Sequence, residues 1–209
     1  RFGPFAWFYA WLVLSGFLIL IQPLFTLFIA PMFNKFTPLE DGELKNRINS
    51  FAQSVNFPIG RIDVMDGSRR SSKANAYFSG LGKNKRIALF DTLIEKHSID
   101  ELVSIIAHEV GHYKKRHNIK GIVMSVVQIG IMFFLLSIFL NNPELFGAFK
   151  MENLSIYASL LFFSLLYSPV ELIISFVGNK ISRIHEFEAD AFAHKSIGTG
   201  KHLIEGLKK

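Results

Sequence analysis

The sequence contains no cysteine, which excludes disulfide bonds and thiol catalysis. Charged residues are also missing from three long stretches, residues 2–34, 121–143 and 153–170. A helix needs about 20 mostly apolar residues to cross a bilayer. All three stretches are long enough, the third comfortably so only if Glu171 is tolerated within it. The missing charge therefore predicts three membrane spans.

The first uncharged stretch differs from a signal peptide. It is too long, it has no basic region beyond Arg1, and no small-residue cleavage site follows it. We therefore expect residues 5–30 to cross the membrane. Because the sequence starts at Arg1 rather than Met, we also expect it to be a fragment or a processed product of a longer chain.

The net charge of +6 is spread over the polar segments. Nucleic-acid binding would need a basic face with a reading element, and the sequence offers none, so we expect no nucleic-acid partner. Basic residues flank the second span (residues 114–120) and follow the third (residues 180–183). Such residues favour the cytoplasmic side of a membrane. The second and third spans are therefore predicted to form a hairpin that returns the chain to that side.

Between the first two spans lies a polar block, residues 34–120. Its first helix is predicted to start at Asp41 as N-cap and to end at Pro58, because apolar residues recur between them at helical spacing. Alternating or β-prone segments follow at residues 61–66, 74–78 and 86–91, which predicts a small sheet of two or three strands.

A second helix of the block has a sharp start. Ser98 followed by Glu101 is a capping-box pattern, and an apolar stripe lies behind it. No proline occurs between Pro58 and Pro143, so this helix can continue into the second span.

That helix carries the sequence H-E-x-x-H, formed by His108, Glu109 and His112. Residues four apart share one helix face, so both imidazoles can reach one metal ion. This is the zinc pattern of metalloproteases, with two ligands and one general base. Zinc lowers the pKa of a bound water to about 7, and Glu109 can accept its proton. The alternative to a metal site is that His108 and His112 are ordinary polar residues of a helix near a membrane.

A catalytic zinc needs a third protein ligand. The extended pattern H-E-x-x-H-x-x-G-x-x-H is excluded because Lys115 and Asn118 occupy its Gly and His positions, and His117 is out of register. A glutamate on a later helix is the other common solution, and residues 182–195 supply candidates. Glu186 and Asp190 lie one turn apart and suit a ligand and a hydrogen-bond acceptor for a ligand histidine. The remaining candidates, Glu188, His185 and His194, are expected to be solvated or ordinary surface residues.

The sequence resembles the CAAX prenyl protease 1 family of integral-membrane zinc metalloproteases. The resemblance lies in residues 107–112 and 182–193 and in two further stretches, residues 29–45 and 67–93. It implies His108, His112 and Glu186 as ligands of one Zn²⁺ per chain, Glu109 as general base and Asp190 as support for a ligand. It also implies that the segment around Asn75 and Ala76 lines the substrate groove, where an extended peptide can pair with a strand edge.

Two family features are missing from these residues, namely additional earlier spans and a later His-Pro-Pro segment. Glu171 has two interpretations. It faces a hydrated interior, as the family's described chamber would allow, or it caps a helix after Pro169 at a break in the membrane span.

The expected fold is mainly α, with multi-span membrane helices, a zinc-metalloprotease helical core and a small β-sheet. The expected parts are a span (1–33), a cytoplasmic-side catalytic block (34–120), a membrane hairpin (121–178) and a helix with the third ligand (179–209).

The expected function is a zinc endopeptidase acting on a peptide or protein substrate near a prenylated CAAX C-terminus. The alternatives are a membrane quality-control protease without prenyl specificity and a non-catalytic scaffold. The protein is expected to be multi-pass in a lipid bilayer with its site on the cytoplasmic side, in the inner membrane of a prokaryote or the endoplasmic reticulum of a eukaryote.

Overall fold

The protein was analysed as a computed structural model that describes residues 3, 5–69, 75–79, 85–140, 142, 144, 147 and 156–208. The chain forms two compact units, each described by itself below. The membrane unit consists of residues 1–21 and 119–183, and the globular unit consists of residues 22–118 and 184–209.

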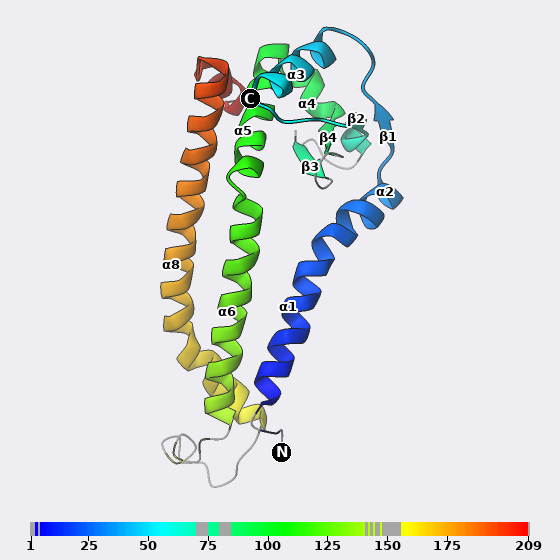
Figure 1. Cartoon of the computed structure of the whole chain (residues 1–209). Helices are drawn as coiled ribbons and strands as arrows, with labels where there is room; N and C mark the ends of the chain where they lie inside the picture. Colours follow the sequence, from blue (N-terminus) through cyan, green and yellow to red (C-terminus); the bar gives the residue numbers. More distant parts are fainter. Residues whose placement is uncertain are drawn as a thin grey trace. The chain divides into compact units, whose positions relative to one another are not determined.

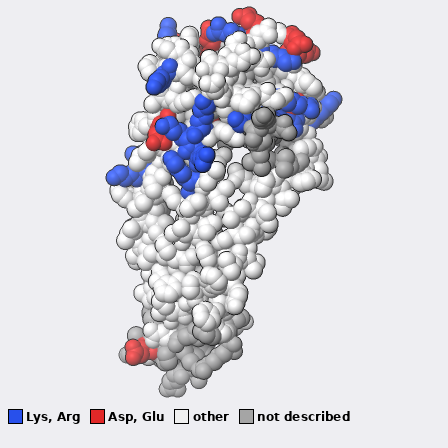
Figure 2. Space-filling view, in the orientation of Figure 1, with Lys and Arg blue, Asp and Glu red and all other residues white. Residues whose placement is uncertain are grey.

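The membrane unit contains most of the three long helices, α1 (Ala6–Leu24), α6 (His117–Leu140) and α8 (Ile156–Ile197) (Figure 1). Among the described residues, these three helices are long and apolar enough to cross a membrane, and each overlaps one of the stretches predicted to be a span. Figure 2 shows a broad visible surface with almost no charged side chains, beside a region where Lys, Arg, Asp and Glu gather. Large apolar side chains such as Leu172 and Phe176 are exposed, as a lipid-facing surface requires.

Specific contacts connect the helices of the membrane unit. The indole Nε1 of Trp11 in α1 donates a hydrogen bond to the main-chain oxygen of Val126 in α6, at 2.8 Å. Gly130 leaves room for this indole, because a Cβ at that position would lie 3.0 Å from Nε1. Farther along, the rings of Phe139 in α6 and Phe163 in α8 pack edge to face with centroids 5.6 Å apart.

Glu171 lies inside α8, which continues through Pro169 without a break. The interpretation of Glu171 as a helix cap is therefore wrong, since the helix that it would cap has already run for many residues. Its side chain is exposed on the helix surface.

The globular unit is built on a four-stranded sheet with the order β1-β2-β4-β3. The strands are β1 (Phe36–Pro38), β2 (Arg61–Met65), β3 (Ala76–Ser79) and β4 (Arg86–Phe90). Strands β2 and β4 are parallel, and the other pairs are antiparallel. The three predicted strands are present, but the prediction of two or three strands is wrong by one. Strand β1 is three residues long and ends in proline, so it has no detectable alternation.

Helices cover this sheet and enclose the core of the globular unit. They are α3 (Glu43–Ser54), α4 (Asp91–Lys96), α5 (Ile99–Lys114) and α9 (Lys201–Leu207), with the short α2 (Ala30–Phe33) after a π-helical turn (Phe25–Ile29). The core combines apolar residues of the strands, of α3 and the segment after it, and of α5. All are nearly inaccessible to solvent: Ile48, Phe57, Ile62, Ile87, Leu89, Leu102, Ile106 and Val110.

The start of α3 differs from the prediction. Gly42, not Asp41, is the N-cap, and it makes no side-chain cap. Asp41 lies one residue too early to reach the first free N–H groups, and its carboxylate instead pairs with Lys45 at 2.6 Å. This exposed ion pair, with its hydrogen bond, lowers the pKa of Asp41.

The start of α5 is as predicted, and its end is not. Ser98 N donates to the Glu101 carboxylate at 2.8 Å, and Glu101 N donates back to Ser98 Oγ, which confirms the capping box. The helix stops at Lys114, however, and α6 begins at His117. Arg116 between them has φ 57°, a left-handed conformation that ends a helix without proline or glycine. The prediction of one continuous helix is therefore wrong.

Candidate metal centre

The two histidines of the H-E-x-x-H sequence lie on the face of α5 that meets α8. Their Nε2 atoms are 3.0 Å apart, and both side chains are mostly buried. Gly111 allows the close approach of the helices, because a Cβ there would lie 3.0 Å from the Cα of Ala189. Ala189 is itself fully buried. Two small residues, Gly111 and Ala189, therefore lie where α5 and α8 come into close contact.

Glu186 of α8 meets both histidines. Its Oε2 lies 3.4 Å from His108 Nε2, and its Oε1 lies 3.7 Å from His112 Nε2. The structure thus brings together the three residues expected to hold a metal. The Glu186 side chain is 57% exposed, against 17% and 20% for the two histidines, so the cluster is open to solvent on the carboxylate side.

The three donors fit a small tetrahedral metal ion. Ligand atoms bound to one zinc-sized ion at about 2.0–2.2 Å lie about 3.3–3.6 Å from one another. Here the two Nε2 atoms are 3.0 Å apart. Glu186 approaches them with its two oxygens, Oε2 at 3.4 Å from His108 and Oε1 at 3.7 Å from His112, so these separations lie in or near that range. Among the described residues, His108, His112 and Glu186 are the group of His and acidic side chains that could hold a metal ion.

Asp190 lies behind one of the histidines. Its Oδ1 is 2.8 Å from Nδ1 of His108, so the imidazole can donate its Nδ1 proton to the carboxylate. This bond leaves Nε2 without a proton and directed toward the other donors. Asp190 therefore lies where a carboxylate that orients a metal ligand is expected.

Glu109 lies beside the histidines and is largely buried. Burial raises the pKa of its carboxyl group, and the nearby Glu186 carboxylate raises it further, although a charge on His108 opposes the shift. Burial has the reverse effect on His112, whose pKa it lowers. Both pKa shifts favour the uncharged form of the side chain, and metal binding requires an uncharged imidazole.

Two residues of α8 that were expected to stay at the surface have partners. The Glu188 side chain is 37% exposed, so it is partly solvated as expected, but its Oε2 also lies 2.9 Å from Nε2 of His117. The ring of His185 stacks on the ring of His117 with centroids 4.0 Å apart, so His185 is not an ordinary surface residue. His194 is exposed, as expected.

His117 is the residue of this site that sequence reasoning missed. It was considered only as a metal ligand and rejected for its register. In the structure its Nδ1 lies 2.9 Å from Nδ1 of His112. The sequence signal that could have indicated a polar partner is the i, i+3 spacing of His185 and Glu188, which places these two side chains near one helix face.

Ala76 is the first residue of β3, an edge strand of the sheet, and Asn75 directly precedes it. Ala76 N donates to the side-chain oxygen of Asn75 at 2.8 Å, and the Asn75 main-chain oxygen accepts from Phe90 at 3.0 Å. The Ala76 side chain is buried, so any contact with a substrate has to use its main chain. Strand β3 packs against α5, the helix that carries His108 and His112. Ala74, the first residue of the predicted strand, lies outside the described residues.

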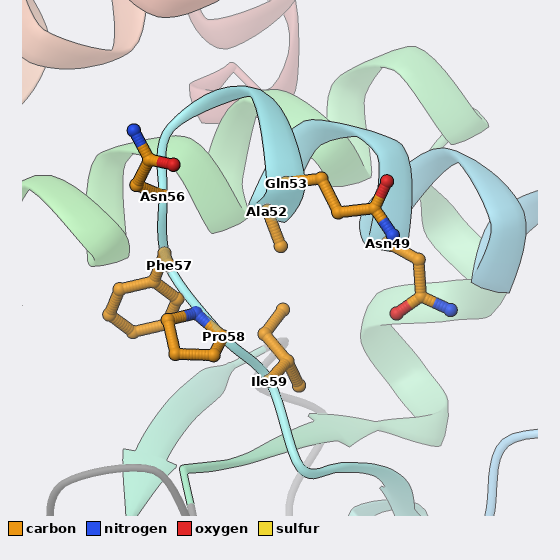
Figure 3. Close-up of a pocket in the computed structure, with 7 residues that line it drawn as sticks. All are labelled: Asn49, Ala52, Gln53, Asn56, Phe57, Pro58 and Ile59. Atoms are coloured by element: carbon orange, nitrogen blue, oxygen red, sulfur yellow. The ribbon is translucent and has the colours of Figure 1, made fainter.

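A separate pocket of about 460 Å³ lies between α3 and the segment that follows it (Figure 3). Ala52 and Ile59 face one another across it, with the amide of Gln53 nearby. None of its lining residues is a candidate metal ligand, and it is unrelated to the cluster described above. The lining consists of Asn49, Ala52, Gln53, Asn56, Phe57, Pro58 and Ile59.

Comparison with known proteins agrees with this arrangement. The family model described as "Peptidase family M48" matches residues 38–209. CAAX prenyl protease 1 of Saccharomyces cerevisiae is 40% identical over 205 residues, which cover 90% of this chain and 45% of that protein. The human CAAX prenyl protease 1 homolog is 34% identical and covers 99% of this chain and 52% of its own length.

The crystal structure of S. mikatae Ste24p superposes with a TM-score of 0.82 at 37% identity, covering 97% of this chain and 50% of that one. The chain thus spans about half the length of the curated relatives it matches. The resemblance indicated by the sequence motifs is confirmed. With its three apolar helices it is an integral membrane protein, and the chain belongs to peptidase family M48.

Proposed function

We propose that this protein is an integral-membrane zinc metalloendopeptidase that hydrolyses peptide bonds near the C-terminus of prenylated CAAX-type proteins. Membership of a metallopeptidase family implies a catalytic metal. The observation that carries the proposal is the meeting of two imidazole nitrogens and one carboxylate, from two helices, at separations that suit one ion. Imidazole and carboxylate donors, with a fourth position left open, are typical of catalytic zinc.

His108, His112 and Glu186 hold the metal in this proposal, one ion per chain. When bound, zinc would act as a Lewis acid that polarises the scissile carbonyl group and activates a water molecule. Asp190 keeps the Nδ1 proton of His108 in place, so that Nε2 remains available. Holding that tautomer is the contribution of Asp190.

Glu109 moves the proton. As general base it accepts a proton from the attacking water, and as general acid it then delivers that proton to the leaving amine. Both steps are served by a carboxyl group whose pKa is raised by burial, because it holds the proton between acceptance and delivery. On α5 it directly follows the proposed ligand His108 and precedes the proposed ligand His112 by three residues.

Strand β3 positions the substrate. Its outer edge has no partner among the described strands, so an extended peptide can add to it through main-chain hydrogen bonds. Asn75 and Ala76 are the residues we assign to this contact. Because β3 packs against α5, a peptide held along its edge runs beside the helix that carries Glu109.

The CAAX specificity rests on similarity to proteins that bear this name. The basic residues beside α6 and α8 support a site on the cytoplasmic side, in the endoplasmic reticulum for a eukaryotic source. A quality-control protease of the same chemistry, without prenyl dependence, is the competing function. Cleavage rates of a farnesylated and an unmodified version of one peptide would separate the two.

The decisive test is Glu109→Gln. We expect the variant to bind zinc as the wild type does and to lose cleavage by at least about 100-fold, because a positioned general base contributes about 10²–10⁴-fold. Zinc content and peptide hydrolysis would be measured on the same preparation. Cleavage that persists in Glu109→Gln would refute the assigned mechanism, and a wild-type protein that binds no zinc would refute the metal site.

A further inference from the structure

His112 has a polar neighbour on the side opposite its candidate metal-binding nitrogen. Its Nδ1 lies 2.9 Å from Nδ1 of His117, and the two rings meet edge to face with centroids 5.0 Å apart. The His117 side chain is only 4% exposed, so water does not replace this contact. Two ring nitrogens at this distance form a hydrogen bond only when one carries a proton and the other does not.

The far side of His117 determines which nitrogen carries the proton. Nε2 of His117 lies 2.9 Å from a carboxylate oxygen of Glu188. An ionised carboxylate only accepts hydrogen bonds, so Nε2 of His117 has to be the protonated nitrogen. In the neutral ring, Nδ1 of His117 is then the acceptor, and Nδ1 of His112 is its donor. Nε2 of His112 is thereby left without a proton, on the side facing Glu186.

We propose that His117 is a positioning residue, which accepts a hydrogen bond from His112, donates one to Glu188, and so fixes the His112 tautomer that can bind a metal through Nε2. This inference rests on the metal site of the proposed function. Glu188 fixes the tautomer of His112 through His117, whereas Asp190 fixes the tautomer of His108 by a direct hydrogen bond. Both carboxylates come from α8, on either side of Ala189, where the two helices are closest.

The backbone supports this role. Arg116 adopts a left-handed φ of 57°, which a residue other than glycine rarely does. The resulting break between α5 and α6 is what places His117 against His112. Stacking of His185 on His117, with an interplanar angle of 12°, then holds the ring in its plane. A strained residue next to a functional group is expected when the surrounding structure depends on it.

Two substitutions of His117 separate positioning from simple packing. In His117→Asn, the side-chain oxygen occupies the place of Nδ1, so it can still accept from His112 while the bond to Glu188 is lost. In His117→Gln, the amide reaches the place of Nε2, so it can still contact Glu188 while the acceptor for His112 is lost. His117→Leu removes both bonds, and His194→Asn on α8 is the control for a histidine away from the site.

The measurement is zinc affinity of the full-length protein in detergent, by competition with a chromophoric chelator, together with the visible absorption spectrum of the cobalt-loaded form. We expect affinity to fall about 10–100-fold in His117→Gln and His117→Leu, as for other residues that orient a metal ligand. His117→Asn should retain most of the wild-type affinity and its cobalt spectrum. His194→Asn should match the wild type.

The opposite ranking, with Gln near wild type and Asn weakened, would show that His117 only ties α6 to α8 and would overturn the inference. Equal affinities in all variants would also overturn it. If His117→Gln does not fold, Glu188→Leu replaces it, because this variant removes the carboxylate that accepts from Nε2 of His117. Unchanged zinc affinity in that Glu188 variant would also overturn the inference. A wild type without zinc would instead refute the metal site itself.

Discussion

The membrane unit and the globular unit are held together in different ways. In the membrane unit, the spans expose their large apolar side chains and meet through a few contacts, such as the hydrogen bond from Trp11 to Val126. In the globular unit, apolar side chains of the sheet, α3 and α5 are buried together, and polar groups of α5 and α8 face one another at set distances.

The difference follows from the solvent. Lipid is as apolar as the side chains, so burial between helices gains little there, and packing and hydrogen bonds have to hold the spans. In water, burial of apolar surface stabilises the globular unit by about 25 cal/mol per Å² and supplies a rigid frame. A metal site needs such a frame, because its donor atoms must stay within a few tenths of an ångström of their places. Substitutions in the two units should therefore differ in what they disturb.

The largest effect is expected for Glu186→Ala in the globular unit. Loss of one of three protein ligands should lower zinc affinity by about 100-fold or more, because the remaining imidazoles do not complete the site. Equilibrium dialysis followed by metal analysis would measure the change. The matched control is Glu205→Ala, which removes an exposed acidic side chain of α9 away from the metal site. Full zinc binding by Glu186→Ala would contradict the ligand set.

Two glycine substitutions compare the units directly. A Cβ at Gly111 meets the backbone of Ala189 at 3.0 Å, whereas a Cβ at Gly130 meets the Trp11 side chain at the same distance. Backbone cannot move aside as a side chain can, so Gly111→Ala should cost about 1–3 kcal/mol of stability, as overpacking does. It should also weaken zinc binding.

Gly130→Ala should cost less and leave zinc affinity unchanged. Thermal unfolding in detergent, with and without zinc, would rank the two variants. A larger loss for Gly130→Ala would mean that the contact between α1 and α6 is the more rigid of the two.

A smaller effect is expected for Trp11→Phe in the membrane unit. The variant loses the N–H that donates to the Val126 oxygen at 2.8 Å and keeps an aromatic ring. Hydrogen bonds between membrane helices contribute about 0.6 kcal/mol on average. Unfolding of the variant by denaturant in detergent should show a loss of about that size, and zinc affinity should not change. A loss of several times this size would indicate that packing of the indole, rather than its hydrogen bond, joins the helices.

The smallest effect is expected for the contribution of Glu109 to the pH dependence of the free energy of unfolding, in the metal-free protein. Folding raises the pKa of this carboxyl above its ordinary value of 4.5, so the folded protein binds the proton more tightly than the unfolded chain. The free energy of unfolding therefore falls as pH rises from about 4.5 through the raised pKa, and levels off above it. Glu109→Gln cannot titrate and lacks this contribution.

The stability difference between the wild type and Glu109→Gln should thus decline across that pH interval. Thermal unfolding of both proteins in the presence of a chelator would measure it. A difference that is constant with pH would mean that Glu109 is as well solvated in the folded protein as in the unfolded chain.

Much of the site could be predicted because it depends on local spacing. The lengths of the uncharged stretches predicted the three spans, and the Ser98–Glu101 pair predicted the start of α5. The i, i+4 spacing of His108 and His112 put two imidazoles on one helix face, and Glu186 and Asp190 share a face in the same way. The spans depend only on the length and composition of a stretch. The other inferences concern residues within about one helical turn, where backbone geometry alone sets the distance.

The elements that were missed depend on contacts or conformations without a local signal. Strand β1 exists because β2 offers it an edge, and Gly42 rather than Asp41 starts α3. The sequence by itself determined the spans, the H-E-x-x-H helix and the later acidic helix. Only the tertiary structure decided how Arg116 turns the chain and that His117 joins His112 to Glu188. The physical reason is that a left-handed arginine carries no glycine or proline signal, and that the bond between His117 and Glu188 joins residues far apart in sequence.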